Sequence, residues 1–264
     1  MGGRRIWQVG EAYERYMGRW SRMVATAFVS WLAVPAGRRW LDAGCGTGAL
    51  AAAVPGAAAP AEVVGVDPSH GFVRHARELV ADPRVRFAAA EAGALPFEDR
   101  RFDVAVSGLV LNFVPDAPAA VAELARVTAP GGTVAAYVWD YSGRMAIIRA
   151  FWAAAAELDP DAEALDEGTR FPLCRPEPLR ALWAGAGLSD VLVEPIEVAV
   201  VFPDFDDYWR PFLGAQGPAP AYAASLSEAH RTALRDRLRE RLPVAADGSI
   251  TLPARAWAVR GATP

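Results

Sequence analysis

The sequence predicts an α/β fold in which one doubly wound, mostly parallel sheet carries helices on both faces. Between residues 39 and 138, apolar runs of strand length alternate with segments of helical periodicity. Such alternation is typical of a parallel sheet covered by helices. The first apolar run also leads directly into a glycine-rich loop and then a helix, which is the local arrangement of a nucleotide-binding unit.

The glycine-rich loop spans residues 41–48, with the sequence Leu-Asp-Ala-Gly-Cys-Gly-Thr-Gly. Its three glycines let the backbone turn sharply and approach a ligand more closely than residues with side chains can. Residues 49–54 resume as a helix, so the loop ends at a helix N-terminus. Asp42 stands at the mouth of this loop, where a carboxylate repels a pyrophosphate and attracts a ligand that carries positive charge.

A second carboxylate supports a nucleoside ligand. Asp67 ends the apolar strand at 62–67 and lies 21 residues beyond Gly46. At this distance, an acid at the end of the second strand accepts hydrogen bonds from ribose hydroxyls. The alternative is that Asp67 caps a helix beginning at Pro68 and Ser69. Loop, acid and spacing together favour the nucleoside site.

The other elements follow from hydrophobic periodicity and from turn residues. Expected strands lie near 39–42, 63–67, 84–88, 102–107, 133–139, 188–201 and 251–260. Expected helices cover parts of 11–32, then 70–80, 117–127, 145–158 and 177–187, with an acidic loop at 159–168. Ser225 and Glu228 have the spacing of a capping box, which predicts the start of one more helix.

Composition excludes several functions. The chain has 264 residues, 53% of them hydrophobic, which is enough for one sizeable core. A net charge of −4 gives no electrostatic footprint for nucleic acid. We find neither a membrane span nor a signal-peptide core, so no membrane partner is expected. Cys45 and Cys174 lie far apart, which favours a reducing cytoplasm over a disulfide framework.

All 27 basic residues are arginine, and the chain contains no lysine. P-loop phosphate binding, Schiff-base catalysis and the Tyr-x-x-x-Lys dyad of short-chain dehydrogenases all need a lysine, so these functions are excluded. The three histidines are scattered and have no metal-ligand spacing, and we therefore expect no metal site.

With these motifs the sequence resembles the class I S-adenosylmethionine-dependent methyltransferases. The resemblance is to their small-molecule branch, which includes ubiquinone and menaquinone biosynthesis methyltransferases. It is specific from about residue 13 to 137 and looser to the C-terminus. Besides the glycine loop and Asp67, it is carried by Glu-Ala-Gly-Ala-Leu-Pro-Phe at 91–97, the strand at 101–107 and Ala-Pro-Gly-Gly-Thr at 129–133.

The resemblance implies a Rossmann-like, seven-stranded, mostly parallel sheet with an antiparallel terminal strand and a helical lid. Residues 1–264 then form a single methyltransferase domain. Within it, 1–35 is an N-terminal helical cover, 36–140 is the cofactor-binding core, and 141–187 and 202–245 are insertions on the substrate side.

The resemblance also implies S-adenosylmethionine as cofactor and S-adenosylhomocysteine as product. In the family, the glycine loop surrounds the methionine part, the acid matching Asp67 holds the ribose, and the acid matching Glu91 contacts the adenine amino group. Arg19 suits the methionine carboxylate, and a solvated arginine on a helix face explains it equally well. The expected cofactor-binding residues are Arg19, Asp42, Ala43, Gly44, Cys45, Gly46, Asp67, Pro68, Ser69, Glu91, Ala92, Ser107 and Asn112.

The implied reaction is in-line transfer of the methyl group to a small-molecule acceptor, and the aromatic residues of the lid suit an apolar or aromatic one. Asp140, Tyr141, Asp206 and Tyr208 are candidate bases among which nothing selects, so the catalytic residue stays open. The methylated atom and the oligomeric state also stay open.

Three alternatives remain. One is an NAD(P)-dependent oxidoreductase, because Gly44-x-Gly46-x-x-Ala49 fits the dinucleotide fingerprint. The second is a non-catalytic protein that binds S-adenosylmethionine. The third is an enzyme of the same fold that uses the sulfonium differently.

Overall fold

The computed structural model describes residues 17–214 and 217–264. Its centre is a seven-stranded sheet with the strand order β3-β2-β1-β4-β5-β7-β6. Strands β1 to β5 are mutually parallel, and β7 runs antiparallel to both of its neighbours. The predicted antiparallel terminal strand is therefore confirmed. The strands are β1 (Arg39–Ala43), β2 (Glu62–Asp67), β3 (Val85–Ala89), β4 (Phe102–Gly108), β5 (Thr128–Trp139), β6 (Ser189–Phe202) and β7 (Ile250–Ala262).

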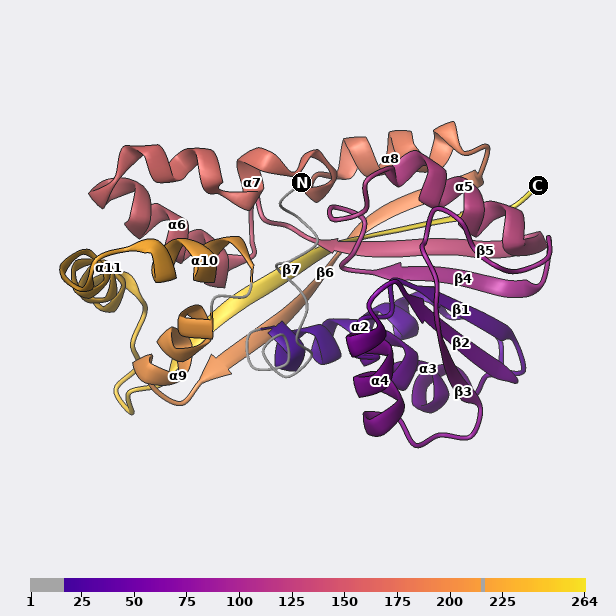
Figure 1. Ribbon diagram of the computed structural model, residues 1–264, viewed down its shortest axis with the longest axis horizontal. Helices are drawn as coiled ribbons and strands as arrows, with labels where there is room; N and C mark the ends of the chain where they lie inside the picture. Colours follow the sequence, from indigo (N-terminus) through magenta and orange to yellow (C-terminus); the bar gives the residue numbers. More distant parts are fainter. Residues whose placement is uncertain (1–16, 215–216) are drawn as a thin grey trace.

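Helices cover both faces of the sheet, as the alternating pattern predicts (Figure 1). One face carries α2 (Arg19–Leu32), α3 (Ala49–Ala58) and α4 (His70–Leu79). The other face carries α5 (Ala117–Val127) and α8 (Pro176–Gly185). The central strands read as continuous apolar runs because both of their faces are buried. In β4, for example, Val104, Ala105 and Val106 are all at most 1% exposed.

The strand order reverses between β1 and β4. Successive connections on either side of this point run in opposite directions, so the loops that leave β1 and β4 diverge. A crevice forms where they separate, beyond the carboxyl ends of the strands. The glycine loop follows β1 and residues 109–116 follow β4, so both motif segments lie at this switch point.

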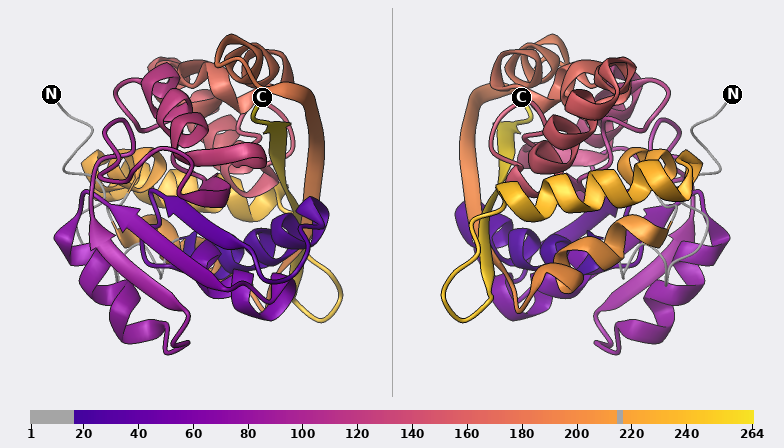
Figure 2. Two further views of the ribbon diagram at one scale, coloured as in Figure 1. Left: turned by 90° about the vertical axis from the view of Figure 1, so that its right-hand side faces the viewer. Right: turned by 90° about the vertical axis from the view of Figure 1, so that its left-hand side faces the viewer.

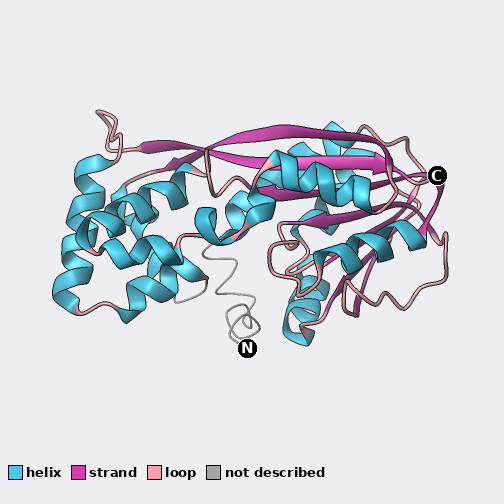
Figure 3. Ribbon diagram, turned by 90° about the horizontal axis from the view of Figure 1, so that it is seen from above, coloured by secondary structure: helices cyan, strands magenta, loops and turns pink. Residues whose placement is uncertain are grey.

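The two strands at one edge form a long antiparallel ribbon. Its pairing runs from Ser189 opposite Ala262 to Phe202 opposite Ile250. At one end the ribbon extends beyond the parallel strands, and helices gather around that end (Figure 3). We call these helices the helical cap. Its members are α6 (Ala146–Leu158), η3 (Pro160–Leu165), α7 (Glu167–Arg170), α9 (Phe205–Trp209), η5 (Arg210–Gly214), α10 (Pro218–Ser225) and α11 (Glu228–Arg241). A short turn, η4 (Pro172–Cys174), leads on to α8.

The cap combines two chain segments that are separated by β6, as the end-on views in Figure 2 show. Phe151 of the first insertion stacks on Phe212 of the second, with ring centroids 4.6 Å apart. The Tyr208 hydroxyl donates to the Ile147 carbonyl at 3.0 Å. Because these contacts join the two insertions, the cap has an aromatic core of its own.

The second insertion also contacts the N-terminal helix. The Arg19 guanidinium forms an ion pair with Asp207 at 2.9 Å and lies 5.1 Å above the centre of the Phe202 ring. The Trp20 ring meets the Phe202 ring edge-on, at 5.8 Å between centroids. These contacts fix the start of α2 against the cap.

Some element boundaries differ from expectation. Strand β5 begins at Thr128 and includes the Gly-Gly turn, because Gly131 donates to the Thr263 carbonyl of the β7 end. The expected loop at 159–168 forms two short helices, since the Asp159 and Asp166 carboxylates each cap the backbone two residues later.

The expected capping box is wrong by two residues. Ser227, rather than Ser225, is the N-cap of α11, and its hydroxyl accepts from the His230 amide at 3.2 Å. The Ser225 hydroxyl instead donates to the Tyr222 carbonyl at 2.7 Å. Part of the expected helical cover, residues 1–16, lies outside the described residues.

Candidate functional site

A cavity of about 710 Å³ opens at the carboxyl ends of β1, β2, β4 and β5. Its size is typical of sites for small molecules and cofactors. The β1–β2 side of the cavity comprises the glycine loop, the segment after β2 and the rim residues Glu91 and Ala92. The β4–β5 side comprises residues from the loop after β4 and from the end of β5: Gly108, Leu109, Val110, Phe113, Val114, Pro115, Tyr137, Trp139 and Tyr141.

The glycine loop is tied to the end of β2. The amides of Gly44 and Cys45 both donate to the Val66 carbonyl, at 2.7 and 2.9 Å. Gly44 has a φ of 79°, and a Cβ there would lie 2.6 Å from a methyl carbon of Val110. Only glycine therefore lets the loop pass this close to the chain that follows β4.

Asp42 is a buried carboxyl group with one free oxygen. It is 1% exposed, and its Oδ2 accepts from the Ala51 amide at 3.1 Å. Oδ1 has no hydrogen-bond partner among residues 17–214 and 217–264, and the residue lines the cavity. Burial raises the pKa of Asp42 to about 7; the Ala51 amide opposes this shift, and the charge of Asp67 adds to it. A cation in the cavity would stabilise the ionised carboxylate.

Asp67 closes the same side of the cavity. Its Oδ2 accepts from the Gly46 amide at 3.1 Å, and its Oδ1 accepts from the Ser69 amide at 2.8 Å. Burial raises the pKa of Asp67, and these two amides oppose the rise. Each oxygen keeps a further lone pair for a ligand hydroxyl. The N-cap of α4 is Ser69, so Asp67 does not serve as the helix cap.

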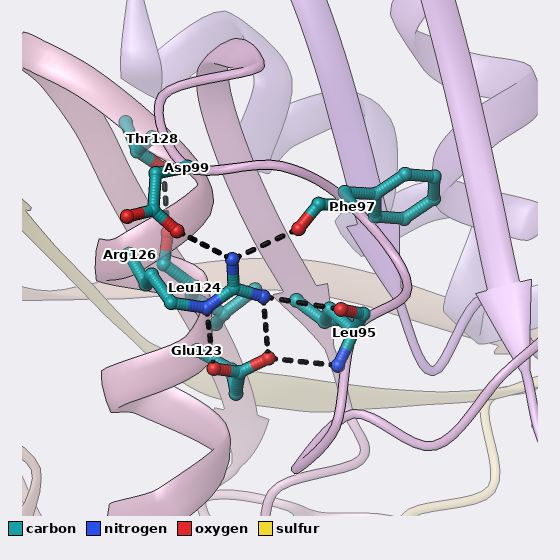
Figure 4. A network of polar contacts seen from close by, with 7 residues as sticks. All are labelled: Leu95, Phe97, Asp99, Glu123, Leu124, Arg126 and Thr128. Carbon is teal, nitrogen blue, oxygen red and sulfur yellow. Dashed lines mark hydrogen bonds and ion pairs between the residues drawn. The ribbon is translucent and has the colours of Figure 1, made fainter.

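The Leu-Pro-Phe segment is held against α5 by Arg126 (Figure 4). The Arg126 side chain donates to the carbonyls of Leu95 and Phe97, at 3.1 and 2.8 Å. It also pairs with Glu123 at 2.6 Å, and Glu123 accepts from the Leu95 amide at 2.8 Å. This network fixes the segment that follows Glu91 at the cavity rim.

Aromatic side chains line the β4–β5 side. We call Phe113, Tyr137, Trp139 and Tyr141 the aromatic wall. Successive side chains of a strand point to opposite faces, so the odd-numbered residues at the end of β5 share one face. Phe171, in the linker before η4, contacts the wall from the first insertion. Its ring lies 5.1 Å from that of Phe113 and 6.0 Å from that of Tyr141.

The turn after β4 has an unusual backbone. Leu109 lines the cavity with a φ of 62°, a conformation that side-chain-bearing residues seldom adopt. Its amide donates to the Tyr137 carbonyl at 2.8 Å, which holds the turn against β5. Strained backbone of this kind concentrates at ligand sites.

The structure brings most of the predicted site residues together. Those that line the cavity are Asp42, Gly44, Cys45, Gly46, Asp67, Pro68, Ser69, Glu91 and Ala92. Arg19, Ala43, Ser107 and Asn112 do not line it.

The structure places these four residues in environments other than the cavity lining. Arg19 pairs with Asp207 in place of a ligand carboxylate. Ser107 donates its hydroxyl to the Ala43 carbonyl at 2.8 Å, inside the sheet. The Asn112 Oδ1 is buried without a hydrogen-bond partner.

Of the four candidate bases, Tyr141 alone lines the cavity. Asp140 pairs with Arg255 at 2.8 Å, and Asp206 pairs with Arg235 at 3.0 Å. The buried Tyr208 hydroxyl is bonded within the cap.

Sequence reasoning missed several lining residues, among them Met17, Tyr137 and Trp139. The aromatic residues at alternate positions from 137 to 141 were a usable signal, because Tyr137 and Trp139 share one face of β5 and Tyr141 follows the strand end. Met17 had no such signal, since long-range packing brings it to the cavity.

The described ranges contain no group of three or more His, Cys, Asp or Glu side chains that could hold a metal ion. In the same part of the chain, every helix is too short or too polar to cross a membrane.

Comparison with known proteins places this site in a family. A family model described as a methyltransferase domain matches residues 41–136. A demethylmenaquinone methyltransferase of Roseiflexus castenholzii is 34% identical over 181 residues, covering 63% of this chain and 74% of that protein. An uncharacterised protein of Mycobacterium bovis is 35% identical over 133 residues, and this alignment spans 48% of each chain.

Among solved structures, a phosphoethanolamine N-methyltransferase of Haemonchus contortus in complex with S-adenosyl-L-methionine has the same fold. The TM-score is 0.61 at 20% identity, over 97% of this chain and 56% of that one. The matches give no support to a nicotinamide-dependent oxidoreductase and favour an enzyme over a non-catalytic binding protein. The chain thus belongs to the class I S-adenosylmethionine-dependent methyltransferases, and it resembles the demethylmenaquinone methyltransferases among them.

Proposed function

We propose that this enzyme transfers the methyl group of S-adenosylmethionine to a small, uncharged acceptor that carries an apolar or aromatic ring. The observation that supports this proposal is the chemical difference between the two sides of the cavity. The β1–β2 side offers carboxylates and backbone turns, and the β4–β5 side offers aromatic rings. The name of the Roseiflexus relative supports an acceptor related to demethylmenaquinone.

On the β1–β2 side, the residues fit the cofactor. The unpaired Oδ1 of Asp42 suits a ligand with positively charged groups. Gly44 lets the loop pass close to Val110, and both residues line the cavity. We assign the ribose hydroxyls to Asp67, whose oxygens keep free lone pairs, and the adenine to the rim at Glu91 and Ala92.

The chemistry that S-adenosylmethionine supplies is an electrophilic methyl carbon on a positively charged sulfur. The contribution of the protein is to hold the acceptor's nucleophilic atom in line with that carbon. Alignment at about 3–3.5 Å can lower the barrier by several kcal/mol. The aromatic wall would exclude water from the reacting atoms, which favours a reaction that disperses charge.

We further propose that the acceptor is not a nucleic acid and that the enzyme works in the cytoplasm. The net charge of −4 supports the first point. Both cysteines are buried and unpaired, which supports a reducing compartment. Cell fractionation with an antibody to the protein tests the location, and recovery in an oxidising compartment would contradict it.

Calorimetric titration tests the cofactor assignment. We expect wild-type protein and the matched surface variant Asp236→Ala to bind S-adenosylmethionine and S-adenosylhomocysteine with micromolar affinity. We expect Asp67→Ala to lose this binding, because the ribose hydroxyls lose their acceptor. Folded wild-type protein that binds neither compound would overturn the proposal, and unchanged binding by Asp67→Ala would overturn the assignment of Asp67.

An assay with radiolabelled methyl groups tests the acceptor class. We expect label to enter dihydroxynaphthalene, a ring compound related to naphthoquinones, and not phosphoethanolamine, the charged acceptor in the name of the Haemonchus neighbour. Labelling of phosphoethanolamine alone would show that the aromatic wall does not select the acceptor.

A further inference from the structure

Trp139 presents an unused hydrogen-bond donor to the cavity. Its side chain is 2% exposed and belongs to the aromatic wall. The indole N–H has no acceptor within residues 17–214 and 217–264. Three other indoles of the chain do have acceptors. Trp31 donates to Glu194 at 2.6 Å, Trp183 donates to the Val134 carbonyl at 3.0 Å, and Trp152 donates to Glu167.

The position of the Trp139 indole in the cavity distinguishes it from another indole that has no acceptor. The Trp40 indole nitrogen is buried and has no partner among the described residues, but Trp40 does not line the cavity. Trp139 does line it, on the strand face that it shares with Tyr137 and Tyr141. The Trp139 donor is unused within the described residues, and a ligand that supplies an acceptor atom gains the free energy of that hydrogen bond.

The chemistry of an indole limits what this ligand can be. An indole N–H donates and cannot accept. It is therefore unsuited to the sulfonium and ammonium groups of the cofactor, which carry positive charge. Asp42 and Asp67, the two protein carboxylates that we assign to the cofactor, lie on the β1–β2 side of the cavity and not on the side of β5. The partner is therefore an atom that carries a lone pair. With the β4–β5 side taken as the acceptor site, that atom belongs to the methyl acceptor.

We propose that Trp139 is a specificity-determining residue, whose indole N–H donates a hydrogen bond to an oxygen of the methyl acceptor. This inference rests on the proposed function, because it takes the β4–β5 side as the acceptor site. It narrows the acceptor to ring compounds that carry a carbonyl or hydroxyl oxygen. Shape alone would admit hydrocarbons of the same size.

The same hydrogen bond would also orient the acceptor. A donor at a fixed position on β5 defines where the oxygen lies, and the ring then lies along the aromatic wall. A hydrogen bond to an oxygen stabilises negative charge on it, so an acceptor hydroxyl bound there ionises at lower pH. Trp139 acts in this way as a positioning residue without exchanging a proton.

A pair of isosteric ligands tests the inference. Acetylnaphthalene and isopropenylnaphthalene, substituted at the same ring position, have the same shape. The ketone oxygen alone accepts a hydrogen bond. Both would be titrated into protein saturated with S-adenosylhomocysteine. We expect wild-type protein to prefer the ketone by roughly two- to tenfold, the range for one neutral hydrogen bond.

Two variants locate the donor. Trp139→Phe keeps an aromatic ring and removes the N–H, so we expect both ligands to bind with nearly equal affinity. Trp31→Phe is the matched control, because its indole donates to Glu194 outside the cavity. We expect this control to keep the wild-type preference. A preference that persists in Trp139→Phe overturns the inference.

The remaining outcomes separate the inference from the proposed function. Equal binding of the two ligands to wild-type protein overturns the role of Trp139 and leaves an apolar acceptor site in place. Failure of both ligands to bind, while S-adenosylhomocysteine still binds, overturns the proposed acceptor class itself.

If Trp139→Phe does not fold, the infrared C=O band of bound acetylnaphthalene replaces it. We expect this band at lower frequency than in hexane, and an equal frequency overturns the inference.

Discussion

The two sides of the cavity are built in different ways. The β1–β2 side is formed by backbone turns and by carboxylates that accept from neighbouring amides. The β4–β5 side is formed by large side chains, and Phe171 reinforces it from a segment beyond β5. We propose that the first side fixes the geometry of the cofactor, which is common to the whole family. The second side can change by substitution of single residues without disturbing the sheet.

The largest expected effect is on the β1–β2 side, at Gly44. In Gly44→Ala the new Cβ would lie 2.6 Å from Val110 at a φ of 79°. We expect a loss of about 1–3 kcal/mol of stability from overpacking, together with loss of S-adenosylmethionine binding. Gly131→Ala is the matched control, because Gly131 also has a positive φ but has no atom within 4 Å of the added Cβ. Thermal unfolding would measure the stability of each variant, and calorimetry would measure its binding of S-adenosylmethionine. Equal losses in the two variants would mean that contact with Val110 is unimportant.

The next effect concerns charge at Asp42, whose folded-state pKa is raised to about 7 from about 3.9 in an unfolded chain. A raised carboxyl pKa means that the folded state holds the proton more tightly. Its contribution to the unfolding free energy is fully present below about pH 3.9. It is lost as pH rises towards about 7.

Cofactor binding should show the opposite trend. The affinity for the positively charged cofactor should rise as pH passes through about 7, because Asp42 then ionises. Asp42→Asn should bind more weakly and show a flatter pH profile. Calorimetry on both sides of neutrality, with Asp236→Asn as control, measures this. A wild-type profile in Asp42→Asn would assign the pH dependence to another group.

A smaller effect is expected at Arg126, which supports the rim of the β1–β2 side (Figure 4). A lysine ammonium cannot donate to Leu95, Phe97 and Glu123 in the geometry of a guanidinium fork. For Arg126→Lys we expect a loss of about 1–2 kcal/mol of stability and weaker cofactor binding. Arg84→Lys is the matched control, because Arg84 pairs with Asp82 away from the cavity. Similar cofactor affinities in the two variants would contradict a role in fixing the rim.

The smallest effect is expected behind the aromatic wall. Phe171→Leu should leave cofactor affinity unchanged, because Phe171 contacts Phe113 and Tyr141 and not the glycine loop. It should weaken acetylnaphthalene binding a few-fold, because an aromatic pair contributes about 0.5–1.5 kcal/mol beyond its buried area. Calorimetry with each ligand separates the two effects. A loss of cofactor affinity would show that the two sides of the cavity are coupled.

The sequence predicts the β1–β2 side well because its signals are local. Gly44, Gly46 and Asp67 act through turns and amides within one βαβ unit, so spacing along the chain translates directly into geometry. The sheet is predictable for the same reason, since each parallel strand carries its own apolar run. Among the predicted site residues, the error at Arg19 falls where the contact is long-range.

Arg19 illustrates the limit of prediction from sequence. Its partner Asp207 is 188 residues away along the chain, and no local pattern predicts which of several acidic groups will reach it. The aromatic wall is less predictable from the sequence than the β1–β2 side and more predictable than the partner of Arg19. Alternation along β5 predicts a shared face, but which helices cover that face depends on the packing of two insertions.

The long β6–β7 ribbon makes the molecule modular in a way that protein engineering can use. Both cap insertions depart from strand ends, one after β5 and one between Phe202 and Ile250. The pairings between the seven strands lie outside them, and only the single bridges of Met145 with Ala254 and of Val244 with Ile250 join the insertions to β7. We expect that loops or whole helices from a relative can be exchanged at these junctions without shifting strand register. Evolution has the same freedom, so acceptor range can diversify while the methyl donor stays the same.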